Sequence, residues 1–186
     1  MLAYAFWHWR RPEIPRDEYE SRQRAFQSAL AAHPPEGFLR STTVRLEGAP
    51  WAAAGAEAYE DWYLVTGMSA LEALNEAAVS AARQAPHDAV AALAEGGIAG
   101  LYGLRAGVPQ SVPRLATWFR KPSGLSYAAL DEALAPIVAT GPATLWMRQM
   151  VLGPTPEFCL HSAKPVELPA GVSSHALELT PVWGAA

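Results

Sequence analysis

An eight-residue stretch near the start of the chain occurs a second time in its middle. Residues 5–12 (AFWHWRRP) and residues 115–122 (LATWFRKP) are both apolar, aromatic-rich runs that end in two basic residues and a proline. Each run is followed by apolar residues at helical spacing. The repetition predicts two copies of one strand–helix unit, and the remaining segments are interpreted as parts of those copies.

The first half of the chain has the pattern of four strands and two helical regions. The expected elements are a strand at 2–10, a helix from Pro15 to Pro34, strands at 38–46 and 59–66, a helix that begins at the capping box Ser69–Glu72 and is interrupted at Pro86, and a strand at 98–105. This order, βαββαβ, is the split βαβ unit of ferredoxin-like folds.

The second half begins the same order again. The expected elements are a strand at 115–121, a helix at 126–140, strands at 143–152 and 157–161, and a last strand at 174–183. Two prolines between Lys164 and Gly171 leave no room for a second helix. We therefore expect that the second unit lacks this helix, and that a partner subunit or the helix around Pro86 covers the sheet face it would occupy.

The doubled unit resembles the dimeric α+β barrel superfamily, in which two ferredoxin-like sheets pack face to face with their helices outside. The resemblance rests on the element order and on the two echoed runs, and it covers nearly the whole chain. It implies an α+β fold of tandem duplicated ferredoxin-like (βαββαβ) units, residues 1–107 and 114–186, in one compact pseudo-symmetric domain. It also implies a barrel formed within the chain, between two chains of a homodimer, or both.

Composition restricts the partners and the compartment. Hydrophobic residues make up 51% of the chain and charged residues 17%, which is typical of a compact soluble protein. The formal net charge of −4 offers no basic surface for nucleic acid or an anionic membrane. No stretch approaches the ~18 apolar residues that cross a bilayer, and the N-terminal apolar run lacks the basic segment of a signal peptide. The single cysteine is compatible with a reducing cytoplasm, where we expect the protein.

A cleft between the two sheets is the predicted binding site. His8 and Arg10 share one face of the first strand, and aligning the two repeats at their prolines places Trp118 opposite His8. Aromatic walls with a few cations suit a small aromatic or acidic ligand. The residues predicted to bind it are Arg10, Trp118, Arg120, Trp146 and Arg148. In the alternative interpretation, the arginines lie in solvent at strand ends and pair with nearby carboxylates.

His8 is the candidate catalytic residue. It lies within a strand between two tryptophans, where an imidazole can act as a general base, although a half-buried structural histidine gives the same pattern. His161 and His175 lie on neighbouring expected strands but lack the spacing of a metal motif, so no metal site is predicted. No cofactor is predicted either, because the superfamily's haem proteins use a histidine on the helix of the second unit, and residues 126–140 contain none.

Three functions remain open. The first is a non-catalytic small-molecule-binding or stress-type α+β barrel protein, because no complete catalytic motif is present. The alternative is a cofactor-free monooxygenase or isomerase that acts on an aromatic or polyketide-like substrate in an inter-sheet or sheet–helix cleft. In that enzyme His8 would be the base, and Arg10 or Arg120 would hold an anion. The third is an interaction module that dimerises through an exposed sheet face.

Overall fold

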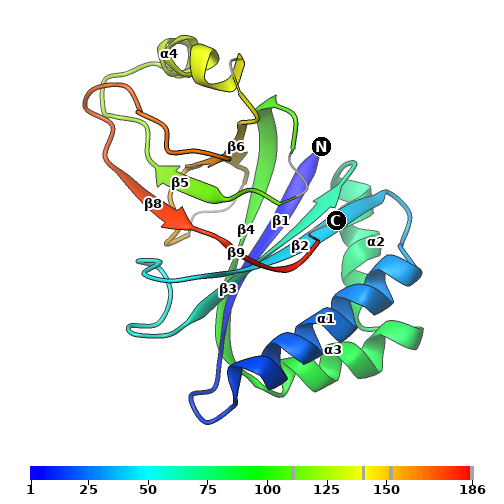
Figure 1. Ribbon diagram of the computed structural model, residues 1–186. Helices are drawn as coiled ribbons and strands as arrows, with labels where there is room; N and C mark the ends of the chain where they lie inside the picture. Colours follow the sequence, from blue (N-terminus) through cyan, green and yellow to red (C-terminus); the bar gives the residue numbers. More distant parts are fainter. Residues whose placement is uncertain (110–111, 140, 151–152, 185–186) are drawn as a thin grey trace.

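The computed structural model describes residues 1–109, 112–139, 141–150 and 153–184 (Figure 1). The strands are β1 (Leu2–Arg10), β2 (Phe38–Leu46), β3 (Ala58–Val65), β4 (Ala94–Gly107), β5 (Leu115–Phe119), β6 (Thr144–Arg148), β7 (Phe158–Ser162), β8 (Ser174–Glu178) and β9 (Thr180–Trp183). The helices are α1 (Arg16–Ala32), α2 (Met68–Ala78), α3 (Gln84–Ala91) and α4 (Tyr127–Ala139), with a 3₁₀ turn, η1 (Ala81–Arg83), before α3.

The strands form one antiparallel sheet that curls into a nearly closed barrel. Its order is β8-β5-β7-β6-β4-β1-β3-β2-β9, so the groups β4-β1-β3-β2 and β8-β5-β7-β6 have the same ferredoxin-like order. β4 pairs with β6, which joins the groups on one side. On the other side the chain itself makes the connection: β8, which pairs with β5, is followed by β9, which pairs with β2. The predicted fold class, tandem ferredoxin-like units forming an α+β barrel, is confirmed, and the barrel forms within one chain.

Several predicted element bounds differ from the structure. The expected last strand is two strands, because the chain bends at Leu179 to reach the edges of two different groups. The predicted capping box of Ser69 and Glu72 is wrong, because α2 begins after Gly67 and no side chain caps it. The predicted interruption is present but lies before Pro86, because α2 ends at Ala78 and η1 follows. Pro86 itself lies in the first turn of α3, where a missing N–H breaks no intrahelical bond. Residue 140, at the end of the expected helix, and residues 151–152 of the expected strand lie outside the described residues.

Tryptophan side chains fill the barrel interior. Trp7 of β1 and Trp118 of β5 are fully buried, and their ring centroids lie 5.4 Å apart. Trp62 and Trp146 pack beside them with centroids 5.2 Å apart. Trp51, from the loop between β2 and β3, packs edge-on against Trp7 and Trp118 and so anchors that loop in the core. The interior is therefore a packed aromatic core.

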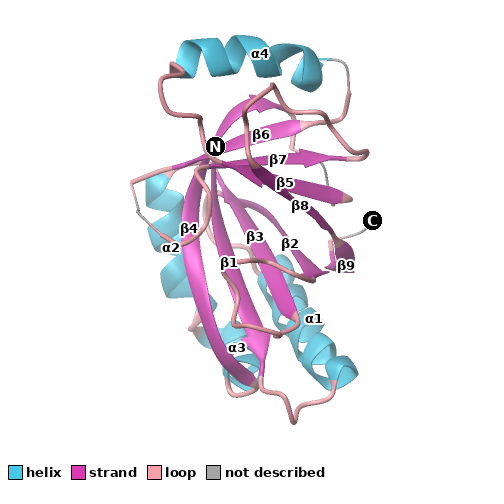
Figure 2. Ribbon diagram, turned by 90° about the vertical axis from the view of Figure 1, so that its left-hand side faces the viewer, coloured by secondary structure: helices cyan, strands magenta, loops and turns pink. Residues whose placement is uncertain are grey.

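The outer face of β1 and β3 is covered by α1, α2 and α3. Figure 1 shows α1 and α3 side by side across this face, and Figure 2 shows α4 at the opposite end of the molecule. The buried residues of α1 recur at helical spacing; they are Tyr19, Gln23, Phe26, Gln27 and Leu30. Two of the five are glutamines. A helix that buries two amides needs polar partners on the strands beneath it. None of the helices in the described part of the chain is long and apolar enough to cross a membrane.

The outer face of the second group is covered by α4 and by a loop. Leu130 and Leu134 of α4 are buried against strand residues such as Phe119 and Phe158. Residues 163–173 contain no helix, which confirms the predicted loss. Side chains of this loop pack against the same cluster, namely Val166, Leu168 and Val172. The loop itself therefore covers the face. The expectation that the helix around Pro86 does so is wrong, because α3 lies on the first group.

Candidate functional site

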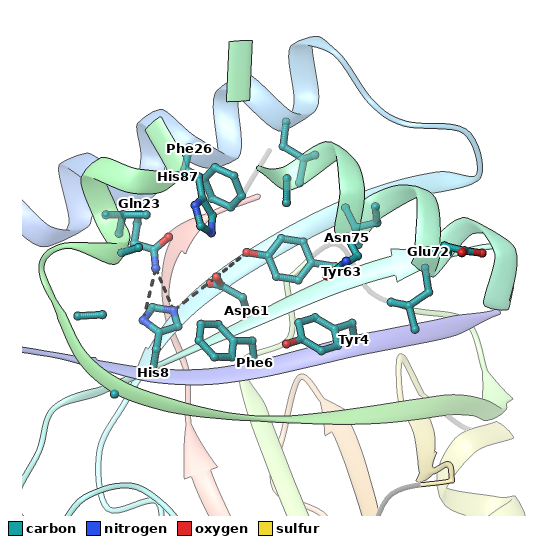
Figure 3. Close-up of a pocket in the computed structure, with 18 of the residues that line it drawn as sticks. Tyr4, Phe6, His8, Gln23, Phe26, Asp61, Tyr63, Glu72, Asn75 and His87 are labelled. Atoms are coloured by element: carbon teal, nitrogen blue, oxygen red, sulfur yellow. Dashed lines mark hydrogen bonds and ion pairs between the residues drawn. The ribbon is translucent and has the colours of Figure 1, made fainter. Parts of the chain in front are cut away.

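A cavity of about 1010 Å³ lies between the first strand group and its helices. Strands β1 and β3 form its floor, and α1, α2 and α3 form its walls (Figure 3). Most of its surface is apolar or aromatic, with contributions from Tyr4, Phe6, Phe26, Leu30, Leu71 and Val90. Small-molecule sites span roughly 300–1,000 Å³, so this cavity has room for a ligand of several rings.

Five polar side chains meet at the buried end of the cavity. Nδ1 of His8 lies 2.6 Å from the hydroxyl of Tyr19, and Nε2 lies 2.9 Å from the amide nitrogen of Gln23. The same Nε2 lies 3.4 Å from Oδ2 of Asp61, and Tyr63 donates a hydrogen bond of 2.7 Å to that oxygen. The side chains of His8 and Asp61 are only 1% and 2% exposed. This group is called the polar end below.

Strand pairing and helical spacing bring these residues together. In the antiparallel pairing of β1 with β3, Phe6 lies opposite Asp61, so His8 is a diagonal neighbour of Asp61 on the same face. Tyr19 and Gln23 are one turn apart on α1, so both reach the same strand. The contact between His8 and Asp61 joins strands that are separated by α1 and β2 in the sequence, and no local motif indicates it.

A chain of hydrogen bonds from β2 and α1 through Tyr63 orients the carboxylate of Asp61. Gln27 donates to the hydroxyl oxygen of Tyr63 at 3.0 Å and accepts from Ser41 at 2.6 Å. The Tyr63 O–H is therefore directed to Asp61. Burial raises the pKa of Tyr63 well above its ordinary value, and the negative charge of Asp61 raises it further. The pKa of Tyr19 is also raised, mainly by burial and to a smaller extent by the negative charge of Asp61. Both phenols therefore stay protonated at neutral pH and can donate hydrogen bonds.

Two oxygens of the polar end lack a hydrogen-bond donor from the described residues. Oδ1 of Asp61 and Oε1 of Gln23 are buried and have no hydrogen-bond partner among the described residues. Both ring nitrogens of His8, in contrast, contact protein groups. A buried acceptor without a partner costs about 1–3 kcal/mol, so these oxygens favour a ligand that donates to them. Asp61 was not predicted as a site residue; its signal in the sequence is an acidic pair, Glu60–Asp61, inside an aromatic strand.

The predicted tryptophans lie on the other side of the sheet from the cavity. Trp118 and Trp146 are 0% and 1% exposed and belong to the barrel interior. The alignment at the prolines placed Trp118 opposite His8, but Trp118 packs against Trp7. The two repeats are thus offset by one residue relative to that alignment, and a shift of one residue reverses the face of a strand. The cavity lies at the sheet–helix cleft, and tryptophans fill the space between the sheets.

The predicted arginines do not line the cavity either. Arg10 donates to the carbonyl of Ile14 at 2.6 Å and lies 3.4 Å from a Glu57 oxygen. Arg120 is exposed just beyond β5, and Arg148 donates to the carbonyl oxygens of residues 153 and 155. Of the residues predicted from the sequence, His8 is the one at the cavity, and nothing brings it together with the arginines.

The two histidines considered for a metal occupy different environments. His161 is buried beside the ring of Trp62, with centroids 4.6 Å apart, and burial lowers its pKa to about 3. His175 is exposed. Within the described ranges, no group of three or more His, Cys, Asp and Glu side chains is placed to hold a metal ion.

Comparison with known proteins relates the chain to solved structures. No protein-family model and no curated protein matches it. A proposed monooxygenase from Fusobacterium nucleatum aligns with 98% of this chain and 92% of its own, at 11% identity and a TM-score of 0.67. A proposed monooxygenase from Lactobacillus acidophilus aligns with 98% of this chain and 94% of its own, at 12% identity and a TM-score of 0.59. A proposed chlorite dismutase aligns over 97% and 95% at 8% identity, with a TM-score of 0.50. At such identities the likeness is one of fold, and the chain accordingly has the fold of the dimeric α+β barrel proteins.

Proposed function

We propose that this protein is a cofactor-free monooxygenase or isomerase that removes a proton from an aromatic or polyketide-like substrate in the sheet–helix cavity. The observation that carries the proposal is the His8–Asp61 pair at the buried end of an apolar cavity, with one carboxylate oxygen unpartnered. A protein that only binds a ligand needs the cavity, but it does not need a buried histidine–carboxylate pair that can accept a proton. The pair therefore favours the enzyme over the non-catalytic binding protein.

Asp61 is the proposed proton acceptor. Its Oδ1 takes a proton from an acidic hydroxyl of the phenol or enol form of the substrate, and the resulting anion has carbanion character at a ring carbon, while Oδ2 stays fixed by Tyr63 and faces His8. The apolar walls keep water from competing for the base. His8 completes the pair as the group that shares the proton with the carboxylate, so the base is the pair and not the imidazole alone.

The two reaction types differ in the fate of the carbanion. In the monooxygenase, the carbanion reduces molecular oxygen, a ring CH₂ becomes C=O, and the second oxygen atom leaves as water: R₂CH₂ + O₂ → R₂CO + H₂O. In the isomerase, the proton returns to a different atom of the substrate and no oxygen is consumed. Two structurally similar proteins described as monooxygenases agree with the first type, although the proposal rests on the cavity.

Oxygen uptake with 1,8-dihydroxyanthrone as the probe tests the proposal. We expect the protein to consume oxygen and form the quinone, or, if it is an isomerase, to speed the tautomerisation of the probe under nitrogen. Asp61→Asn should lower kcat by about 10²–10⁴-fold. The matched control is Glu76→Gln on the exposed side of α2, outside the cavity, which should retain the wild-type rate. An inactive wild-type protein, or a fully active Asp61→Asn variant, would overturn the proposal.

A further inference from the structure

Gln23 brings a second acceptor to the polar end. Its amide nitrogen lies 2.9 Å from Nε2 of His8, so its oxygen is on the other arm of the amide, away from that contact. In Figure 3 this oxygen lies on the side of Asp61 and His87. The side chain is 3% exposed and lines the cavity, and Oε1 has no partner among the described residues. A buried carbonyl-type oxygen is satisfied only if a bound molecule donates to it.

The two unpartnered acceptors belong to side chains that contact the same histidine. Gln23 and Asp61 contact the same atom, Nε2 of His8, at 2.9 Å and 3.4 Å. Their free oxygens, Oε1 and Oδ1, therefore belong to one end of one cavity.

The charge of the cavity disfavours an anionic ligand. Its described lining includes two carboxylates, Asp61 and Glu72, and neither lysine nor arginine. The lining also includes two histidines: His8 contacts Asp61 at 3.4 Å, and His87 lies 3.1 Å from Asp88. A ligand carboxylate at the polar end would lie next to Asp61, and the two acids would share His8 as their one neighbouring imidazole, so the buried like-charge pair is unfavourable. Of the aromatic and acidic ligands expected from the sequence, the lining favours the aromatic class.

The geometry points to an uncharged aromatic diol as the ligand class, with one hydroxyl donating to Oδ1 of Asp61 and the other to Oε1 of Gln23. The ring system lies against the aromatic floor that includes Phe6. This inference rests on the proposed function for the role of Asp61 as base, whereas the contact with Gln23 requires no reaction. Gln23 is thus the residue that sets specificity, because it distinguishes a diol from a single phenol.

A series of naphthalene probes tests the ligand class by isothermal titration calorimetry at pH 7. The series comprises 1,8- and 2,3-dihydroxynaphthalene, 2-naphthol, 2,3-dimethoxynaphthalene and 3-hydroxy-2-naphthoate. We expect the better diol to bind about tenfold more tightly than 2-naphthol, as one added hydrogen bond implies. The dimethoxy compound and the carboxylate should bind more weakly than 2-naphthol. The inference is overturned if neither diol binds more tightly than 2-naphthol, or if the carboxylate binds as tightly as the better diol.

A matched pair of variants tests the role of Gln23. Gln23→Met keeps the length of the side chain and removes the acceptor, so the ratio of the Kd values for 2-naphthol and the diol should fall from about ten to about one. Gln84→Met changes an exposed glutamine of α3 outside the cavity and should retain the wild-type ratio. The ratio is measured within each variant, so a general loss of affinity cancels. A wild-type ratio in Gln23→Met would contradict the inference.

The two proposals fail in different ways. If the protein prefers diols through Gln23 but turns over no 1,8-dihydroxyanthrone, the reaction is wrong and the ligand class stands. If it turns over the anthrone through Asp61 without any preference for diols, the ligand class is wrong and the reaction stands. Should Gln23→Met fail to fold, the probe series on the wild-type protein decides the question alone.

Discussion

Nε2 of His8 and Oδ2 of Asp61 lie 3.4 Å apart beneath α1, at a place where neighbouring strands of the barrel bring two ionisable groups to one face. The hydroxyl of Tyr63 holds the same carboxylate oxygen at 2.7 Å, and the other oxygen is buried without a hydrogen-bond partner among the described residues. This arrangement supports the proposal that the two residues act as one unit, and the first prediction follows from it.

A double-mutant cycle should show strong coupling between His8 and Asp61. His8→Asn and Asp61→Asn should each lower kcat for 1,8-dihydroxyanthrone by about 10²–10⁴-fold, because each removes one half of the base. The double variant should be no more than about threefold slower than the worse single variant, since residues that act as a unit are not additive. Losses that multiply in the double variant would show that the two residues act independently.

Glu60 should make the protein less stable as the pH rises. The carboxyl group is fully buried in the barrel interior, where it accepts hydrogen bonds of 2.5 Å from the indole N–H groups of Trp7 and Trp62. Burial raises its pKa to about 7 from an ordinary value of 4.5. Because the folded pKa lies above the unfolded one, the protonated group favours folding below pH 4.5, and this contribution is lost between pH 4.5 and 7.

Glu60→Gln removes that dependence. Relative to the variant, the wild-type free energy of unfolding should fall by about 3 kcal/mol between pH 4.5 and pH 8, which corresponds to a pKa difference of about 2.5. Urea denaturation at both pH values measures it, with the exposed substitution Glu76→Gln as the control. Parallel pH profiles for the wild type and Glu60→Gln would contradict the assignment.

Gly107 should tolerate alanine far less well than Gly124. Both have left-handed backbone, with φ of +83° and +82°. A Cβ at Gly107 would lie 2.2 Å from the carbonyl oxygen of Ala143, whereas nothing lies within 4 Å of one at Gly124. We expect Gly124→Ala to cost about 1–2 kcal/mol from the backbone conformation alone, and Gly107→Ala to cost at least about 2 kcal/mol more. Urea denaturation of both variants measures the difference, and equal losses would show that the strand end at Gly107 relaxes freely.

Leu168 should contribute to stability although it lies in a loop. It packs with the cluster beneath α4, in the place where the second helix of the unit is missing. Leu168→Ala should lower the free energy of unfolding by about 1–2 kcal/mol, as expected for a partly buried leucine. The neighbouring exposed substitution Glu167→Ala should change it by less than about 0.5 kcal/mol. Thermal unfolding of the two variants makes the comparison, and a negligible effect of Leu168→Ala would mean that the loop does not cover the sheet.

Much of the fold could be predicted from local patterns. The bounds of β1 and β2 are those expected, because period-two alternation and flanking prolines are properties of short stretches. The missing second helix followed from two prolines. The homodimer expected from the superfamily remains a prediction, and light scattering in solution tests it.

The site itself was only partly predictable. His8 was found because an imidazole within an aromatic strand is unusual, but its partners come from α1 and β3, at distances in the sequence that no motif connects. The predicted tryptophans lie in the barrel interior, and the predicted arginines do not line the cavity at His8, so the expected site residues are not gathered in one place. An offset of one residue in the alignment of the repeats moved Trp118 from the barrel interior to the face of His8.

The sequence by itself determined the order of the elements, the duplication and the compact aromatic core, because hydrophobic period and helix breakers act over a few residues. Only the tertiary structure decided which face of each strand meets the helices, where a cavity of ligand size remains, and which polar side chains, such as Asp61 and Gln23, line it. Those features depend on strand register and helix placement, which arise from the packing of the whole chain.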